Sequence, residues 1–199
     1  MHHAQRAATY IEVDVNPTMN PNPNMPVKPT EARVGRENQR YNLETGARMV
    51  AGCICMDEAK ERIIMILSIK HPDRWILPKG GIELDEGDEF VTTAVRETWE
   101  EAGCEGKILR KLPVVYDSRG KNAPTIKGSF DPSKVIPKTE FHFYDMVIDQ
   151  LSQDWPELHK RQRRWCTYSE AKHELVKANR PELVLALELS AVRHDEEVY

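Results

Sequence analysis

A dense run of acidic residues between positions 83 and 101 constrains this chain more than any other feature of its sequence. The run holds eight carboxylates and one basic residue, Arg96, and therefore carries a net charge of −7. The spacing of its apolar residues predicts a helix over 89–102. Gly103 follows that helix and is expected to form its C-terminal cap.

Three glutamates, Glu97, Glu100 and Glu101, share one narrow face of the predicted helix, because they stand at positions i, i+3 and i+4. Carboxylates this close repel one another unless water solvates them or a hard divalent cation binds them. A solvated acidic face is the simpler interpretation of such a run taken alone. The glycine turn at 78–81 favours a cation and phosphate site, because glycine lets the backbone approach phosphate oxygens closely.

The rest of the chain divides into an arm, one domain and a tail. Five of the 13 prolines fall within residues 16–29, so residues 1–30 are expected to form a disordered or extended arm. One domain is expected over 31–192, with a long loop over 117–138 and a tail over 193–199. Short apolar runs come first, one helix lies in the middle and helices follow at the end, which predicts a mixed sheet covered by helices.

The expected strands and cysteine positions follow from short apolar runs. The predicted strands are 49–56, 62–69, 112–116, 141–148 and 165–168, and the later predicted helices are 169–178 and 181–192. Cys53 and Cys55 are interpreted as small buried thiols rather than ligands. His142 is expected to point out of the sheet as an ordinary surface or loop-facing residue. The four cysteines show no metal-binding spacing, no apolar run is long enough for a membrane helix, and no secretory signal is evident, so a cytoplasmic or nuclear location is expected.

The acidic helix and the glycine turn together carry a family resemblance. Gly80, Glu86 and the run from Arg96 to Cys104 (RETWEEAGC) resemble the Nudix hydrolase signature GX5E…REUXEEXGU. Nine residues separate Glu86 from Arg96 where the signature has seven, so Asp88 is an alternative occupant of the place of Glu86. The resemblance implies the Nudix fold, an α/β/α sandwich in which helices cover a mixed central sheet.

Further segments resemble one Nudix subfamily, the fungal diphosphoinositol polyphosphate phosphohydrolases, which also hydrolyse diadenosine polyphosphates. The segments are residues 31–60, HPDRWILPKGG, RETWEEAGCEGKI, TEFHFY, HKRQRR and NRPEL. The resemblance implies a hydrolase of inositol pyrophosphates and diadenosine polyphosphates that uses Mg²⁺, with Mn²⁺ or Zn²⁺ as substitutes. Inorganic polyphosphate is a further expected substrate, because it is a chain of the same phosphoanhydride bonds.

The same resemblance implies roles for individual residues. Glu97 and Glu101 would bind the metal, and Glu100 would be a further ligand or the base that activates water. Arg96 would orient these carboxylates, and Gly80 would contribute to the metal site. The substrate-binding residues implied are Arg40, Arg48, Ser68, Lys70, Lys79, Gly80, Gly81, Arg161 and Arg180.

The net charge of −4 includes two segments of opposite charge. Residues 83–101 carry −7, whereas residues 159–164 (HKRQRR) carry +4. The overall balance excludes a histone-like polycation, while the partition suits a small polyanion bound jointly by cations and a divalent metal. Neither a membrane nor a nucleic acid is expected as a partner, and a monomer is favoured.

Two other functions stay open from the sequence. A Nudix hydrolase of the nucleotide pool or of mRNA caps should hold a base between aromatic rings, yet only 7% of the residues are aromatic. A non-catalytic protein that binds inositol polyphosphates should have lost glutamates of the signature, yet Glu97, Glu100 and Glu101 are all present.

Overall fold

The computed structural model describes residues 28–117, 121–122 and 135–195. Its helices are the 3₁₀ turn η1 (Leu84–Glu86), α1 (Phe90–Ala102), α2 (Tyr168–Lys177) and α3 (Pro181–Leu189). Its strands are β1 (Arg48–Met56), β2 (Arg62–Leu67), β3 (Trp75–Ile76), β4 (Lys79–Gly81), β5 (Cys104–Lys111), β6 (Val115–Tyr116), β7 (Lys121–Asn122), β8 (Val135–Ile136), β9 (Thr139–Leu151) and β10 (Arg163–Thr167). The predicted arm falls largely outside the described residues, as do 118–120 and 123–134 of the predicted loop.

A mixed sheet forms the centre of the molecule, with the strand order β10-β2-β1-β9-β5. The long strands β1 and β9 run parallel to each other, from Arg48 opposite Thr139 to Met56 opposite Val147. The other neighbours pair antiparallel, and the short strands β3, β4 and β6 attach to β2, β1 and β9.

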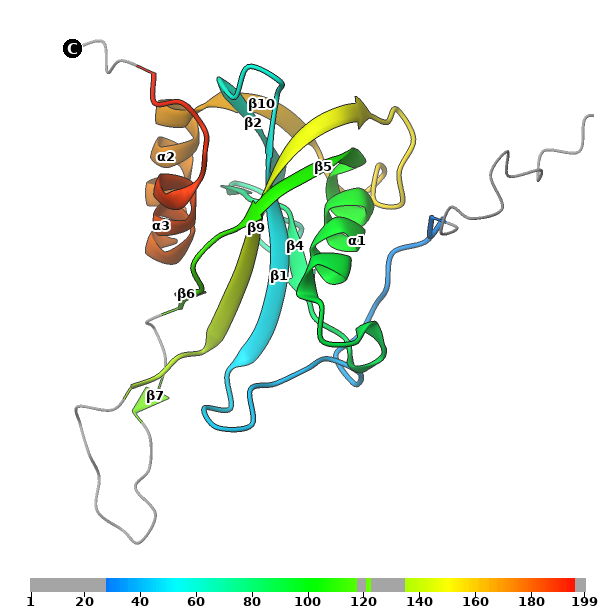
Figure 1. Ribbon diagram of the computed structural model, residues 1–199, viewed down its shortest axis with the longest axis vertical. Helices are drawn as coiled ribbons and strands as arrows, with labels where there is room; N and C mark the ends of the chain where they lie inside the picture. Colours follow the sequence, from blue (N-terminus) through cyan, green and yellow to red (C-terminus); the bar gives the residue numbers. More distant parts are fainter. Residues whose placement is uncertain (1–27, 118–120, 123–134, 196–199) are drawn as a thin grey trace, which may run out of the picture.

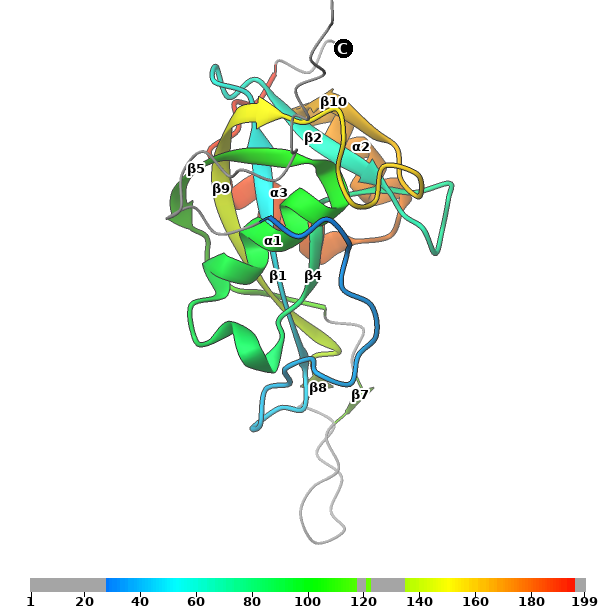
Figure 2. The ribbon, with the colours of Figure 1, turned by 90° about the vertical axis from the view of Figure 1, so that its right-hand side faces the viewer.

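Helices cover both faces of this sheet, with α1 on one side and α2 and α3 on the other (Figures 1 and 2). Every residue of β1 after Arg48 is buried, because a central strand covered on both faces loses contact with water on both sides. The predicted α/β/α sandwich is therefore confirmed. Among the described residues, no helix combines the length and the apolar character needed to span a membrane.

One long strand was not predicted from the sequence, and another is longer than predicted. Residues 104–111 form β5 at an edge of the sheet, but half of these residues are exposed and half are charged, so they lack the apolar run that marks a buried strand. Strand β9 continues to Leu151, beyond the predicted end at 148. Within the predicted loop 117–138, residues 121–122 and 135–136 pair as a two-stranded ribbon.

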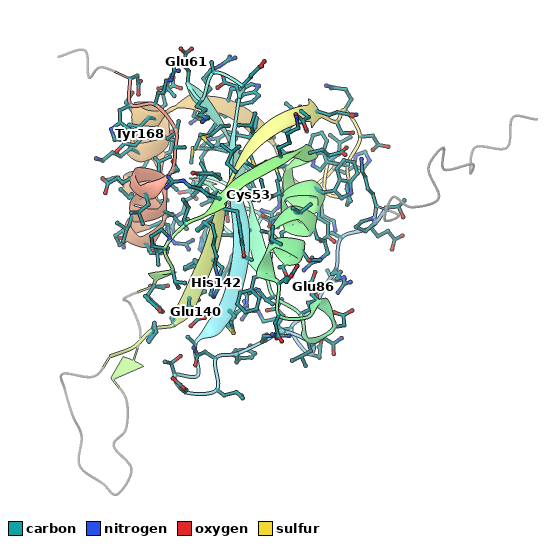
Figure 3. The ribbon with its side chains drawn as sticks, in the orientation of Figure 1. Cys53, Glu61, Glu86, Glu140, His142 and Tyr168 are labelled. Atoms are coloured by element: carbon teal, nitrogen blue, oxygen red, sulfur yellow. The ribbon has the colours of Figure 1, made fainter. Side chains whose placement is uncertain are left out.

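His142 does point out of the sheet, but it is an interior residue, so the prediction of an ordinary surface or loop-facing residue is wrong. His142 is only 5% exposed, lies edge-to-face on Phe90 at the start of α1, and shares a 2.8 Å contact between its Nε2 and Glu140 Oε1 (Figure 3). The alternation of β9 turns this residue toward α1, and only the packed helix makes that face an interior one. The prediction for Cys53 and Cys55 is confirmed, since both are free and fully buried.

Candidate active site

The glycine turn lies directly beneath the acidic helix. Its residues form β4, which pairs antiparallel with β1 so that Lys79 stands opposite Gly52. A Cβ atom at Gly80 would overlap the carboxylate of Glu97 on α1. Glycine at this position lets the helix carboxylate approach the turn backbone, and a larger residue would have to displace that carboxylate.

Arg96 connects the glutamates of the site. Its side chain is 8% exposed, and it donates from Nε and Nη2 to the two oxygens of Glu86, at 2.6 and 3.0 Å. Its Nη1 atom donates to Glu97 Oε1 at 2.7 Å and to Glu100 Oε2 at 3.2 Å. Arg96 therefore pairs with Glu97 and Glu100 of the three signature glutamates, and with Glu86 upstream.

The structure also distinguishes Glu86 from Asp88, the two residues that could occupy the first glutamate position of the signature. Glu86 is buried against Arg96 and accepts further hydrogen bonds from the Thr93 hydroxyl and the Glu83 amide. Asp88 is 96% exposed and pairs with Arg40 instead. Glu86 is accordingly the residue that holds Arg96, and the longer spacing is absorbed in the loop between η1 and α1.

Glu101 faces the opposite side of the site from Arg96. Its Oε2 atom accepts a hydrogen bond from the Lys79 amide at 2.8 Å, and its Oε1 atom is 2.5 Å from Nη2 of Arg161. Arg161 also pairs through Nε with Glu157, one turn earlier in the same connection. Residue 161 of the basic cluster therefore reaches the helix that carries the acidic residues.

Burial of these charges shifts their titration. Burial, reinforced by the nearby charge of Glu101, raises the pKa of Glu97 to about 8. Burial likewise raises the pKa values of Glu100 and Glu101. On the other side, burial lowers the pKa of Lys79 to about 8. Burial makes it unfavourable to ionise these carboxyl groups, and a bound cation would offset that free-energy cost.

The chemistry of the donor set suits a hard divalent cation, although its oxygens are not gathered around one point. Carboxylate oxygens are the ligands that Mg²⁺ prefers, and Oε1 of Glu100 is buried with no hydrogen-bond partner among the described residues. In that same part of the chain, no three Asp, Glu, His or Cys side chains converge tightly enough to hold an ion. The oxygens of Glu97 and Glu101 are turned instead toward Arg96 and Arg161.

A groove of about 490 Å³ opens beside Glu101 and is rich in cations. Its lining includes seven of the predicted substrate residues, namely Arg48, Ser68, Lys70, Lys79, Gly80, Arg161 and Arg180. Two predicted residues do not line it. Gly81 is buried behind the turn, and Arg40 pairs with Asp88 and lies over the Phe90 ring on the α1 side of the sheet.

Several residues outside the nine implied substrate contacts also line the groove; of these, the sequence leaves Lys138 as a weaker candidate and His71 and Arg74 open between a structural role and ligand contact. Asp117, Lys138 and Thr139 stand at the two ends of the predicted loop, and Phe141 follows on β9. His71 and Arg74 flank the turn before β3 and also line the groove. Proximity to a long loop was the one sequence signal for the first group, because loop ends meet where the strands they join lie side by side.

Comparisons with known proteins agree with this geometry. The NUDIX domain family matches residues 46–187. Nudix hydrolase 21 (chloroplastic) of Arabidopsis thaliana is 32% identical over 156 residues, covering 76% of this chain and 71% of the relative. Human diphosphoinositol polyphosphate phosphohydrolase 3-alpha is 31% identical over 150 residues, covering 74% of this chain and 76% of the relative.

A solved structure shows the same fold. A NUDIX hydrolase from Nitrosomonas europaea superimposes with a TM-score of 0.53 at 11% sequence identity, covering 71% of this chain and 86% of that one. The chain belongs to the Nudix hydrolase family. Nudix hydrolases generally act on small phosphorylated substrates and use divalent metal ions such as Mg²⁺.

Proposed function

We propose that this protein hydrolyses phosphoanhydride bonds in diphosphoinositol polyphosphates, releasing phosphate and leaving inositol hexakisphosphate, and in diadenosine polyphosphates. The observation that carries the proposal is the lining of the groove, where seven of 17 residues are Lys or Arg and two are acidic. Such a groove suits a compact ligand that carries many phosphates. The relatives named as diphosphoinositol polyphosphate phosphohydrolases support the same substrate class. Inorganic polyphosphate is a further proposed substrate.

The chemistry depends on the carboxylates of α1. Glu97, Glu100 and Glu101 would hold the divalent ion, which when bound neutralises the diphosphate and polarises the attacking water. Arg96 keeps two of these carboxylates in place. The uncommitted Oε1 atom of Glu100 is suited to accept a proton from water. Water then adds to phosphorus, the phosphoanhydride P–O bond breaks, and the leaving phosphate departs.

The cations around the groove bind and orient the substrate. Arg180 lies 5.9 Å above the Phe141 ring and borders the groove together with Lys79. Arg161 is paired with Glu101 in the free protein, so a phosphate would compete with Glu101 for its guanidinium. Phe141 is the one aromatic side chain in the described lining, and Arg180 covers it. That arrangement disfavours a nucleobase held between two aromatic rings.

The proposal is tested by incubating the purified protein with Mg²⁺ and one substrate per reaction. The substrates are diphosphoinositol pentakisphosphate, diadenosine hexaphosphate, a nucleoside triphosphate and a capped RNA. We expect release of phosphate from the first and cleavage of the second. Glu101→Gln should lose most of this activity while its circular dichroism spectrum is unchanged. Preferential turnover of the nucleotide or the cap would replace the proposal with the nucleotide alternative. Tight binding of inositol hexakisphosphate without any turnover would indicate a binding protein.

The cellular setting is also a proposal. All four cysteines are free and buried, which suits a reducing compartment such as the cytoplasm or nucleus. We propose that the protein acts there as a monomer on small-molecule polyanions. Gel filtration with light scattering and imaging of a tagged full-length chain would check both points.

A further inference from the structure

A segment outside the matched family region runs across the candidate active site. Residues 28–40, here called the strap, precede the NUDIX match at 46–187 and lie alongside α1 (Figure 2). Its first end is anchored on the helix, where Pro29 accepts a hydrogen bond from Trp99 Nε1 at 2.9 Å. Its second end is anchored on the glycine turn, where the Arg40 amide donates to Ile82 at 2.6 Å.

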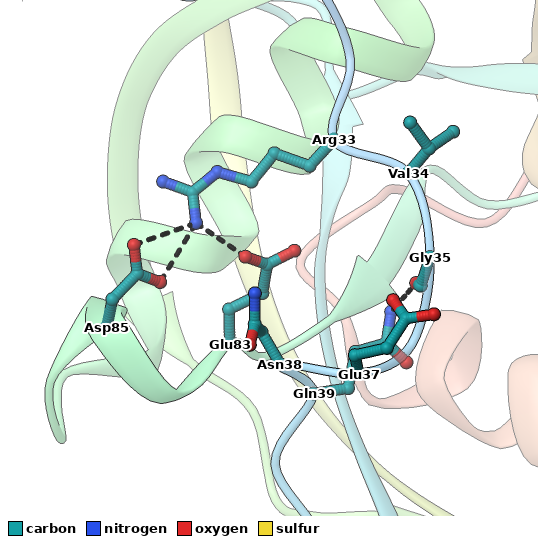
Figure 4. A pocket seen from close by; sticks show the side chains of 8 residues that line it. All are labelled: Arg33, Val34, Gly35, Glu37, Asn38, Gln39, Glu83 and Asp85. Carbon is teal, nitrogen blue, oxygen red and sulfur yellow. Dashed lines mark hydrogen bonds and ion pairs between the residues drawn. The ribbon is translucent and has the colours of Figure 1, made fainter.

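Arg33 lies between these anchors and contacts the site in two ways. Its guanidinium pairs with Glu83 at 2.6 Å and Asp85 at 2.9 Å, beside a polar pocket of about 340 Å³ that the strap lines (Figure 4). Its backbone amide donates to Glu100 Oε2 at 3.2 Å. The guanidinium therefore ties the strap to η1, while the backbone amide, placed by the anchors at Pro29 and Arg40, contacts the glutamate.

The contact with Glu100 distinguishes the two oxygens of one carboxylate. Oε2 accepts from both the Arg33 amide and Arg96 Nη1, each at 3.2 Å. Oε1 is buried and has no hydrogen-bond partner in the described part of the chain. Two donors on one oxygen hold the carboxylate in one rotation about its terminal bond, and they leave the other oxygen available for chemistry.

We infer that the strap is a positioning element for the active site and that Arg33, through its backbone amide, is a positioning residue that fixes the rotation of the Glu100 carboxylate. The inference rests on the proposed function for the part that concerns turnover. It goes beyond that function because it assigns a role to residues that precede the match to the NUDIX domain at 46–187. Removing the amide should lower kcat and leave KM nearly unchanged, because the groove that binds substrate keeps its cations.

Matched variants separate the amide from the side chain. Arg33→Pro removes both, Arg33→Ala keeps the amide, and Val34→Pro introduces proline at the neighbouring strap residue, which is 90% exposed. Because a hydrogen bond to a charged group is worth roughly 1.5–3 kcal/mol, we expect Arg33→Pro to lower kcat about 10-fold or more, with KM within about 2-fold. Arg33→Ala should stay within about 3-fold of wild type, and Val34→Pro close to wild type. Equal effects of the two prolines, or a rise in KM alone, would overturn the inference.

Two measurements keep the inference testable if Arg33→Pro does not fold or if no substrate is turned over. Trp99→Phe removes the indole N–H that anchors the strap, and it should lower kcat in the same direction with KM unchanged. Amide hydrogen exchange on the unmodified protein needs no substrate, and the Arg33 amide should exchange at least about 10-fold more slowly than the Val34 amide. Equal exchange rates would contradict the strap contact itself, whereas absent turnover with a protected amide would count only against the proposed function.

Discussion

Some residues at this site matter because neighbouring groups lie very close to them, and not only because they carry a reactive group. Gly80 carries no reactive group, yet no side chain fits between it and the Glu97 carboxylate. Arg96 and Glu86 form a buried ion pair whose partners are held by further hydrogen bonds. Replacing one member of such a set disturbs the neighbours that depend on it.

Gly80→Ala should abolish most activity and reduce stability. The added methyl group must displace the Glu97 carboxylate or the turn, and overpacking of this kind costs about 1–3 kcal/mol. Urea unfolding and phosphate release would measure the two effects. Gly46→Ala is the control, because it also replaces a glycine but meets no atom within 4 Å, and its strain comes only from a backbone φ of +72°. Equal loss of activity in both variants would contradict the close-approach explanation.

Lys70→Ala should raise KM for polyphosphate substrates on the order of 10-fold, because a charge-assisted contact to phosphate is worth about 1.5–3 kcal/mol. The rise should shrink as salt is added, since salt screens exposed charges. Steady-state kinetics at two salt concentrations would show this. Lys172→Ala is the matched control, because Lys172 pairs with Glu188 on the α2–α3 side. An unchanged KM for Lys70→Ala would remove this residue from the binding site.

Among the elements, helix α1 has two roles, one for its glutamate-bearing face and one for its N-terminal turn. One face carries the glutamates toward the glycine turn, and its C-terminus ends at Gly103 in the left-handed conformation, as the sequence predicted. The N-terminal turn instead packs Phe90 on His142 of β9. The loop from η1 to α1 adjusts between them, which allows Glu86 to reach Arg96 despite the longer spacing.

Glu86→Ala should lower the free energy of unfolding by about 1–3 kcal/mol, because the buried Arg96 guanidinium loses the carboxylate that binds its Nε and Nη2 atoms and keeps only Glu97 and Glu100. Asp88→Ala should change it by less than about 1 kcal/mol, since the Arg40 pair is a surface one. Urea denaturation of both variants gives the comparison. If Asp88→Ala proved the more destabilising, Asp88 would hold the structural position instead.

The buried imidazole of β9 should make stability depend on pH. Burial lowers the pKa of His142 below its usual value near 6.5, although Glu140 opposes the shift and Lys111 adds to it. As pH falls below about 6.5 the unfolded chain gains a proton that the folded chain does not, so stability falls by at most ~1.4 kcal/mol per pH unit. Unfolding at pH 7, 6 and 5 should show a smaller slope for His142→Gln than for wild type. Parallel curves would contradict the assignment.

At the scale of the whole molecule, the packed sheet seals its interior from solvent. The core extends through β1, β2 and β9 to both helical layers, and the four thiols lie within it. Burial raises the pKa of Cys53 to about 12, and burial also raises the pKa values of Cys55 and Cys166. A thiol that stays protonated and buried reacts slowly.

A thiol reagent such as Ellman's reagent at pH 8 should therefore label none of the four cysteines in the folded protein within minutes. All four should react in 6 M guanidinium chloride, because unfolding exposes them and restores an ordinary pKa. Absorbance at 412 nm counts the thiols in each state. Rapid labelling of one thiol without denaturant would show that part of the core opens locally.

Helices, caps and strands that are specified by residues close together in the chain could be predicted from the sequence. The helical spacing of Glu97, Glu100 and Glu101, the cap at Gly103 and the apolar strands of the core were all readable, because periodicity and turn chemistry depend on near neighbours. Strand β5 was not, since a charged edge strand is specified by its partner β9 rather than by its own side chains.

Only the tertiary structure decided which distant groups meet. It paired Glu86 rather than Asp88 with Arg96, buried His142 under α1, and brought cations from positions between 48 and 180 into one groove beside Glu101. It also laid the strap across the helix. The physical reason is that hydrogen bonds and burial act over a few ångströms in space, whatever the separation along the chain, so contacts such as that between Arg33 and Glu100 leave no local pattern in the sequence.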